Sequence, residues 1–204
     1  MNDYDILLLT ETWNSNLSNT KIDGYESFNC SRPKSNKKAK RDSGGVIVYY
    51  KQRYRNYLQL ISINTNGLVW FKLKKEIGNF ENDLILCLCY IPPEGSSVYR
   101  NENSDLYDYD FFESLNNDII RYSELGTIYL AGDFNSRTGS ELDFVPDIGL
   151  DRFVDVPLNE DSSSLSKRKN FDTVVNSFGL KLLTLCKENN LFPRNGQNYL
   201  SWNV

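Results

Sequence analysis

The stretch that decides the fold is Thr127-Ile128-Tyr129-Leu130-Ala131-Gly132-Asp133-Phe134-Asn135. Its first five residues are typical of a buried β-strand, and polar side chains follow directly after the glycine. Residues two apart in an extended chain point to the same side, so Asp133 and Asn135 face one space where the strand ends. A carboxylate there can hold a hard cation or accept a proton from water, and an amide can donate to a phosphate oxygen.

A second polar strand end lies near the start of the chain, where the apolar run 5–9 leads into Thr10-Glu11-Thr12. Ligands bind at the carboxyl ends of strands in many α/β proteins. If the two strands are near neighbours in the sheet, Glu11 and Asp133 converge on a space the size of one hydrated Mg²⁺. Each residue also has a plainer interpretation, because an Asp-Phe-Asn after glycine often forms a turn and a glutamate after an apolar run often caps a helix.

Further elements follow from hydrophobic periodicity. Half-buried helices are predicted over 109–122 and 171–189, where apolar residues recur at spacings of three and four. The short links between successive strands favour antiparallel pairing, and the polar stretch 136–169 is predicted to be a long surface excursion. The strands are predicted at 5–9, 24–29, 44–51, 58–63, 68–73, 84–91, 127–131 and, at the C-terminus, 198–204.

Composition bounds the class of protein. A chain of 204 residues, 40% hydrophobic and 13% aromatic, predicts one packed α/β domain over residues 1–204, with no segment of membrane-spanning length. The net charge of −4 argues against a protein that covers nucleic acid or another polyanion with most of its surface. The basic loop 31–43 is interpreted as solvated, with contact to a nucleic-acid backbone as the alternative. The four cysteines form no CxxC pair and are expected to be buried free thiols in a reducing, intracellular compartment.

Several segments together resemble the endonuclease/exonuclease/phosphatase superfamily, and above all the apurinic-endonuclease-like domain of non-LTR retrotransposons. The resemblance rests on segments 8–13, 44–49, 90–93, 130–139, 179–186 and 189–196, and so covers nearly the whole chain. It implies a two-sheet α/β sandwich of the DNase I-like type, Mg²⁺- or Mn²⁺-dependent phosphodiester hydrolysis, and DNA as substrate. It further implies a nuclear setting and a reverse transcriptase domain in a longer parent protein.

The resemblance also implies roles for single residues. Glu11 looks like the metal ligand, Asp133 like the carboxylate that orients or deprotonates the attacking water, and Asn135 like the amide that positions water and phosphate. Tyr90 stands where the family places a tyrosine that donates to the scissile phosphate, although a strand-end tyrosine before Pro-Pro is equally a packing residue. Arg137 is expected to reach a nearby phosphate.

The chain departs from the family pattern in two places. The family's first strand, which supplies an asparagine, has no counterpart before Met1, and the final Asp-His strand has none after Val204; the sequence contains no histidine. Losing one hydrogen-bond donor positioned toward the reacting group typically lowers the rate about 10²- to 10³-fold. The chain is therefore interpreted as a fragment or decayed copy, with feeble or absent activity. Two alternatives stay open: a phosphatase or lipid phosphodiesterase on the same fold, and a non-catalytic module that binds nucleic acid or protein.

Overall fold

The computed structural model describes residues 4–13, 21–32, 43–64, 66–100, 102, 104, 106–144 and 170–193, with the backbone alone at 31, 32 and 43. The chain forms two compact units, residues 1–135 and 136–204, and each is described by itself. The prediction of one domain over 1–204 stays a prediction. The basic residues between 33 and 42, the stretch 145–169 and the predicted strand 198–204 lie outside the described residues.

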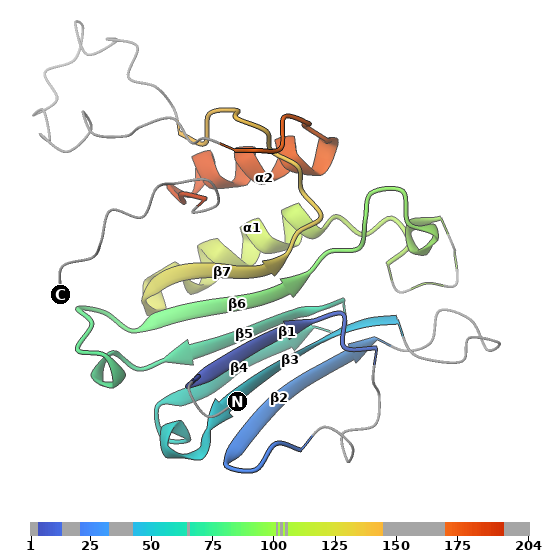
Figure 1. Ribbon diagram of the computed structural model, residues 1–204. Coiled ribbons are helices and arrows are strands. Elements are labelled where there is room, and N and C mark those ends of the chain that lie inside the picture. The colour runs from blue at the N-terminus through green and yellow to red at the C-terminus, as the bar shows by residue number, and fades with distance from the viewer. Residues whose placement is uncertain are drawn as a thin grey trace, which may run out of the picture. The chain divides into compact units, whose positions relative to one another are not determined.

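The first sheet of unit 1 has three antiparallel strands in the order β1-β3-β2 (Figure 1). They are β1 (Ile6–Thr10), β2 (Tyr25–Arg32) and β3 (Ser43–Lys51), close to the ranges predicted from the sequence. The central strand β3 is rich in Val, Ile and Tyr, whose branched or aromatic side chains suit a pleated, buried surface.

The second sheet has the strand order β4-β5-β6-β7. Its strands are β4 (Leu58–Asn64), β5 (Leu68–Leu73), β6 (Leu84–Tyr90) and β7 (Thr127–Asp133). The predicted antiparallel pairing of successive strands is confirmed for β4, β5 and β6, but it is wrong for β3 and β4, which lie in different sheets. The β6 and β7 strands run parallel, because the long connection between them includes a helix that returns the chain to the same end of the sheet. Their carboxyl ends therefore lie at one edge.

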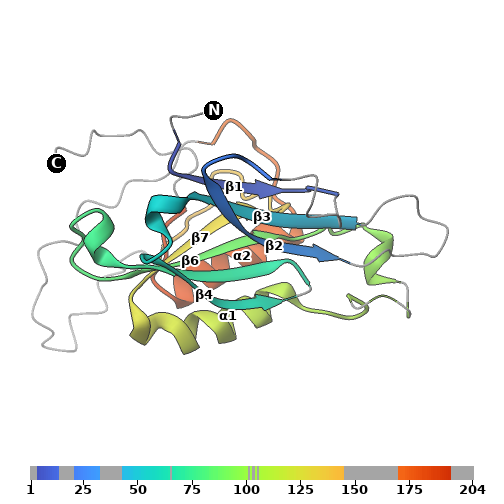
Figure 2. The same ribbon diagram turned by 90° about the horizontal axis from the view of Figure 1, so that it is seen from below.

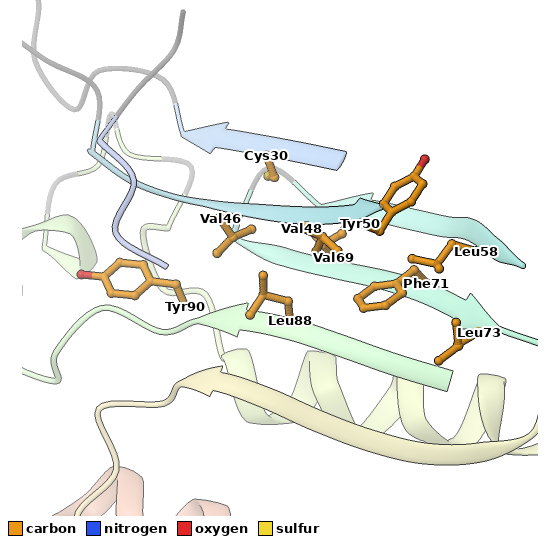
Figure 3. Close-up of a cluster of buried hydrophobic side chains, with 10 residues drawn as sticks. All are labelled: Cys30, Val46, Val48, Tyr50, Leu58, Val69, Phe71, Leu73, Leu88 and Tyr90. Carbon is orange, nitrogen blue, oxygen red and sulfur yellow. The ribbon is translucent and has the colours of Figure 1, made fainter. Parts of the chain in front are cut away.

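The two sheets pack face to face around a buried apolar cluster (Figures 2 and 3). Side chains on β3 alternate, so that Val46, Val48 and Tyr50 point into this cluster. The partners that face them from β5 and β6 include Val69, Phe71 and Leu88. Unit 1 is thus a mixed α/β structure with two sheets, which agrees with the predicted sandwich.

The helix α1 (Phe111–Tyr122) covers the other face of the second sheet (Figures 1 and 2). The carboxylate of Asp110 accepts the first backbone N–H groups of the helix, which fixes its start two residues later than predicted. The Trp70 ring lies edge-on to Tyr122 at 5.2 Å between centroids, and its indole N–H donates to Asp118 at 2.8 Å. Short 3₁₀ turns occur at Gln52–Tyr54, Lys75–Ile77, Ser97–Tyr99 and Ser123–Leu125.

In unit 2 the helix α2 spans Ser177–Glu188 and begins six residues later than predicted from 171. The Asn176 side chain accepts the backbone N–H of Gly179 at 2.7 Å and so caps the helix. Before the cap, the Asn170 and Asp172 side chains accept backbone N–H groups two residues on, which holds the chain in turns. The apolar spacing from 171 to 175 therefore does not continue the helix.

Two further predictions can be compared with the described residues. Cys30, Cys87, Cys89 and Cys186 are all buried free thiols, as predicted. In the part of the chain that the structure describes, no helix is long and apolar enough to cross a membrane.

Candidate functional site

The candidate site begins where the carboxyl ends of three strands come together in unit 1. The register of β6 and β7 places Tyr90 beside Asp133. The Tyr90 hydroxyl donates to Glu11 Oε1 at 2.6 Å, which joins the end of β6 in one sheet to the residue after β1 in the other. The Tyr90 ring is only 5% exposed and lies at the edge of the core cluster (Figure 3), so the residue packs, while its donation to a scissile phosphate stays a prediction.

The segment that carries Glu11 has an unusual backbone. Glu11 and Trp13 adopt φ values of 53° and 49°, in the left-handed region that costs a non-glycine residue about 1–2 kcal/mol. The N–H groups of Thr12 and Trp13 donate to the carbonyls of Gly45 (3.2 Å) and Gly44 (2.8 Å). These bonds to β3 hold the strained turn in place.

The polar side chains at the end of β7 form hydrogen bonds with nearby backbone groups. Asp133 Oδ1 accepts the backbone N–H of Asn135 at 2.8 Å, which is the turn that the plainer interpretation of Asp-Phe-Asn predicts. The Asn135 amide donates to the Ile91 carbonyl at 2.8 Å, and the Ile91 N–H donates to the Asp133 carbonyl at 2.8 Å. Asn135 also has a left-handed φ of 47°. These contacts join the segment after β7 to the segment after β6. They also hold the half-buried side chains of Asp133 and Asn135 in place.

Arg137 belongs to unit 2 and forms a two-pronged ion pair there. Its Nε and one terminal nitrogen donate to the Asp172 carboxylate at 2.7 and 2.8 Å. The Arg137 guanidinium, helped by the backbone N–H of Val174, lowers the pKa of the Asp172 carboxyl to about 2. The predicted role of Arg137 in binding phosphate stays a prediction, and in this structure its donors bind Asp172.

Glu11 and Asp133 reach the same edge of unit 1 by a different arrangement from the one that the sequence suggested, because β1 and β7 contact each other across the two sheets. The condition was that β1 and β7 be near neighbours in one sheet, but β1 pairs with β3 and β7 pairs with β6, in separate sheets. Glu11 instead meets Tyr90 across the sandwich. Within the described residues, no group of three or more His, Cys, Asp or Glu side chains lies close enough to hold a metal ion.

Sequence reasoning missed three groups that position the site. The carbonyls of Gly44 and Gly45 hold the Glu11 turn, and the Ile91 carbonyl holds Asn135. The Gly-Gly pair was a usable signal, because both glycines have left-handed φ values, 64° and 96°, that other residues adopt at a cost. No local pattern pointed to the Ile91 carbonyl, since a backbone acceptor leaves no mark in the sequence.

Comparisons with known proteins are sparse. No protein-family model and no curated protein matches this chain. Among solved structures, one match is the human Nocturnin catalytic domain with a bound sulfate anion, at 18% sequence identity and a TM-score of 0.36. The match covers 65% of this chain and 52% of that one, so this chain spans about half the length of the matched structure. A likeness of this degree does not establish a family.

Proposed function

We propose that unit 1 carries a metal-dependent phosphodiesterase site of the endonuclease/exonuclease/phosphatase type, built from Glu11, Tyr90, Asp133 and Asn135. The observation that carries this proposal is the 2.6 Å hydrogen bond from Tyr90 to Glu11. It joins, across two sheets, two of the residues for which the sequence resemblance implies roles. Because Asp133 is the register partner of Tyr90, the same strand ends also bring a second carboxylate to this edge.

The donor set suits Mg²⁺ or Mn²⁺. Glu11 is exposed and uses Oε1 to accept from Tyr90, which leaves Oε2 for a cation. Hard cations prefer carboxylate oxygens, and Mg²⁺ is often held by one or two carboxylates, several waters and the substrate phosphate. A site with few protein ligands is therefore adequate. When bound, the cation supplies positive charge beside the phosphate that undergoes attack.

The remaining chemistry falls to side chains of the chain itself. Asp133 keeps Oδ2 to accept a proton from the attacking water, because Oδ1 is held by the N–H of Asn135. Asn135 follows Asp133 at the end of β7, and its side-chain amide is a donor of the kind that can orient a phosphate oxygen. The Tyr90 hydroxyl holds the Glu11 carboxylate in one orientation. Donation by Tyr90 to the phosphate, as the family resemblance implies, would require this bond to open.

The finer proposal is that the substrate is DNA and that the chain derives from the endonuclease of a non-LTR retrotransposon. It is supported by the sequence segments around Glu11, Tyr90 and Asp133 alone. A phosphatase or lipid phosphodiesterase would use the same groups, so the choice of substrate needs experiment.

A non-catalytic binding module is the second candidate. It is favoured by the local contacts of Asp133 and Asn135, which both serve the backbone around the end of β7. On this interpretation the two residues are structural. DNA binding would then be salt-sensitive but indifferent to EDTA and to Glu11→Ala.

The test measures metal binding and turnover separately. Binding of Mn²⁺ is followed by electron paramagnetic resonance, and hydrolysis is assayed on supercoiled plasmid and on bis(p-nitrophenyl) phosphate. We expect Glu11→Gln to weaken Mn²⁺ binding, and Asp133→Asn to lower the rate by about 10²- to 10³-fold while Mn²⁺ still binds. Glu113→Gln, an exposed glutamate in the first turn of α1, is the matched control and should change neither.

Each outcome separates the candidates. Metal-dependent nicking of plasmid that both variants lose supports the DNA endonuclease. Cleavage of the small diester alone supports the phosphatase or lipid phosphodiesterase. If Mn²⁺ binds the Glu11→Gln protein as tightly as the wild type and neither substrate is cleaved, the catalytic proposal is wrong.

A further inference from the structure

Trp13 is an exposed aromatic side chain in the same turn as Glu11. It is 42% exposed, whereas Trp70, the other tryptophan among the described residues, is completely buried. An exposed tryptophan ring offers a large, flat apolar surface on which a ligand can stack.

The backbone of Trp13 is fixed and strained. Its φ of 49° is left-handed, and its N–H donates to the Gly44 carbonyl at 2.8 Å. Strained backbone that the surrounding structure enforces is concentrated at binding and catalytic sites. The turn thus fixes the backbone that carries the indole, which lowers the entropy lost when a ligand orders this segment.

The spacing to Glu11 limits what the ring can reach. Two residues of chain span at most about 7 Å, so the two Cα atoms lie within that distance. Bases stacked in one strand of nucleic acid are about 3.4 Å apart. A nucleotide one or two steps from a phosphate that a cation at Glu11 would hold therefore lies within reach of the indole.

We propose that Trp13 is a substrate-binding residue that stacks on an unpaired base next to the scissile phosphate. This inference rests on the proposed phosphodiesterase site and narrows its substrate class to nucleic acid with an accessible base. Stacking fits the side chain, because every base has a π-face and a flat aromatic ring binds it without regard to sequence. Small alkyl phosphoesters and lipid head groups offer no such face.

The experiment measures binding without hydrolysis. Anisotropy of a fluorescein-labelled single-stranded DNA of about 12 nucleotides is titrated in EDTA, and an abasic oligomer of equal length is titrated alongside. Loss of one stacked base costs about 1–3 kcal/mol, so Trp13→Ala should weaken binding of the base-bearing DNA about 5- to 150-fold. Binding of the abasic oligomer should not change, and Trp13→Phe should stay close to the wild type.

Two more variants keep the test decisive. Phe80→Ala removes an aromatic side chain of nearly equal exposure, 43%, after β5 at the opposite end of the sheet, and should have no effect. Trp13→Leu keeps an apolar side chain without a π-face, and it replaces Trp13→Ala if that variant does not fold. It should bind the base-bearing DNA as weakly as Trp13→Ala.

The inference is overturned if Trp13→Leu binds base-bearing DNA like the wild type, because the contact would then be a general apolar one of the kind a protein partner makes. Equal losses for the base-bearing and abasic oligomers would also overturn it. Since binding is measured without metal, it is independent of turnover. Unchanged binding by Trp13→Ala in a protein that nicks plasmid refutes the stacking role alone. Selective loss of binding in a protein that cleaves neither substrate supports stacking and refutes the phosphodiesterase.

Discussion

We expect a coupling energy of about 1.5 kcal/mol between Tyr90 and Glu11, measured as free energy of unfolding in a double-mutant cycle. The four proteins are the wild type, Tyr90→Phe, Glu11→Ala and the double variant. Hydrogen bonds to charged groups contribute about 1.5–3 kcal/mol, and we take the lower value because the Glu11 carboxylate is exposed and water can replace its donor. Tyr90→Phe keeps the buried ring, so core packing is preserved.

The cycle also cancels the strain of the Glu11 backbone. Any change in strain caused by alanine at a φ of 53° occurs with both Tyr and Phe at position 90 and drops out of the coupling energy. Urea unfolding followed by tryptophan fluorescence gives the free energies of unfolding. With a denaturant slope of about 1–3 kcal/mol per M, a change of 1.5 kcal/mol moves the midpoint by about 0.5–1.5 M.

A second tyrosine–glutamate pair supplies the control. The Tyr50 hydroxyl donates to Glu26 Oε2 at 3.0 Å, away from the candidate site. Adding Mn²⁺ should alter the coupling between Tyr90 and Glu11 but leave that between Tyr50 and Glu26 unchanged. A coupling energy for Tyr90 and Glu11 within about 0.5 kcal/mol of zero would refute the reasoning, because independent sites add to within that margin.

Three further predictions concern stability. Phe71→Ala should lower the free energy of unfolding by about 3–5 kcal/mol, because Phe71 is completely buried between the sheets; a urea midpoint like that of the wild type would contradict this. Gly132→Ala should lower the free energy of unfolding of unit 1 by at least about 3 kcal/mol in the same assay. The reason is that φ of Gly132 is 128° and an added Cβ would overlap the Cys89 carbonyl. The ion pair of Arg137 with Asp172 lowers the carboxyl pKa to about 2 from an ordinary 3.8, so its contribution is present above pH 3.8 and lost as the pH falls toward 2. NMR titration of the Asp172 carboxyl should show the low pKa in the wild type and an ordinary value in Arg137→Ala.

Local patterns in the sequence determined most of the secondary structure. The strands and α1 were predictable because alternation and three-to-four spacing of apolar residues reflect which side of an element is buried. The same reasoning placed Glu11, Tyr90 and Asp133 at strand ends. It failed at the start of α2, where the apolar spacing already begins at 171 but the Asp172 side chain holds the backbone in a turn and the Asn176 side chain caps the helix, so that α2 begins only at Ser177.

Only the tertiary structure decided which strand ends meet. Glu11 and Tyr90 are 79 residues apart in the chain, and nothing local to either predicts their hydrogen bond. Pairing of β1 with β3 and of β7 with β6 put the two carboxylates in separate sheets, because strand partners are chosen by packing between distant segments. The sequence by itself therefore determined which residue types are available at the ends of the strands. The packing of the two sheets determined that Tyr90 holds Glu11, and that the Glu11 turn is held by the Gly44 and Gly45 carbonyls of a neighbouring strand.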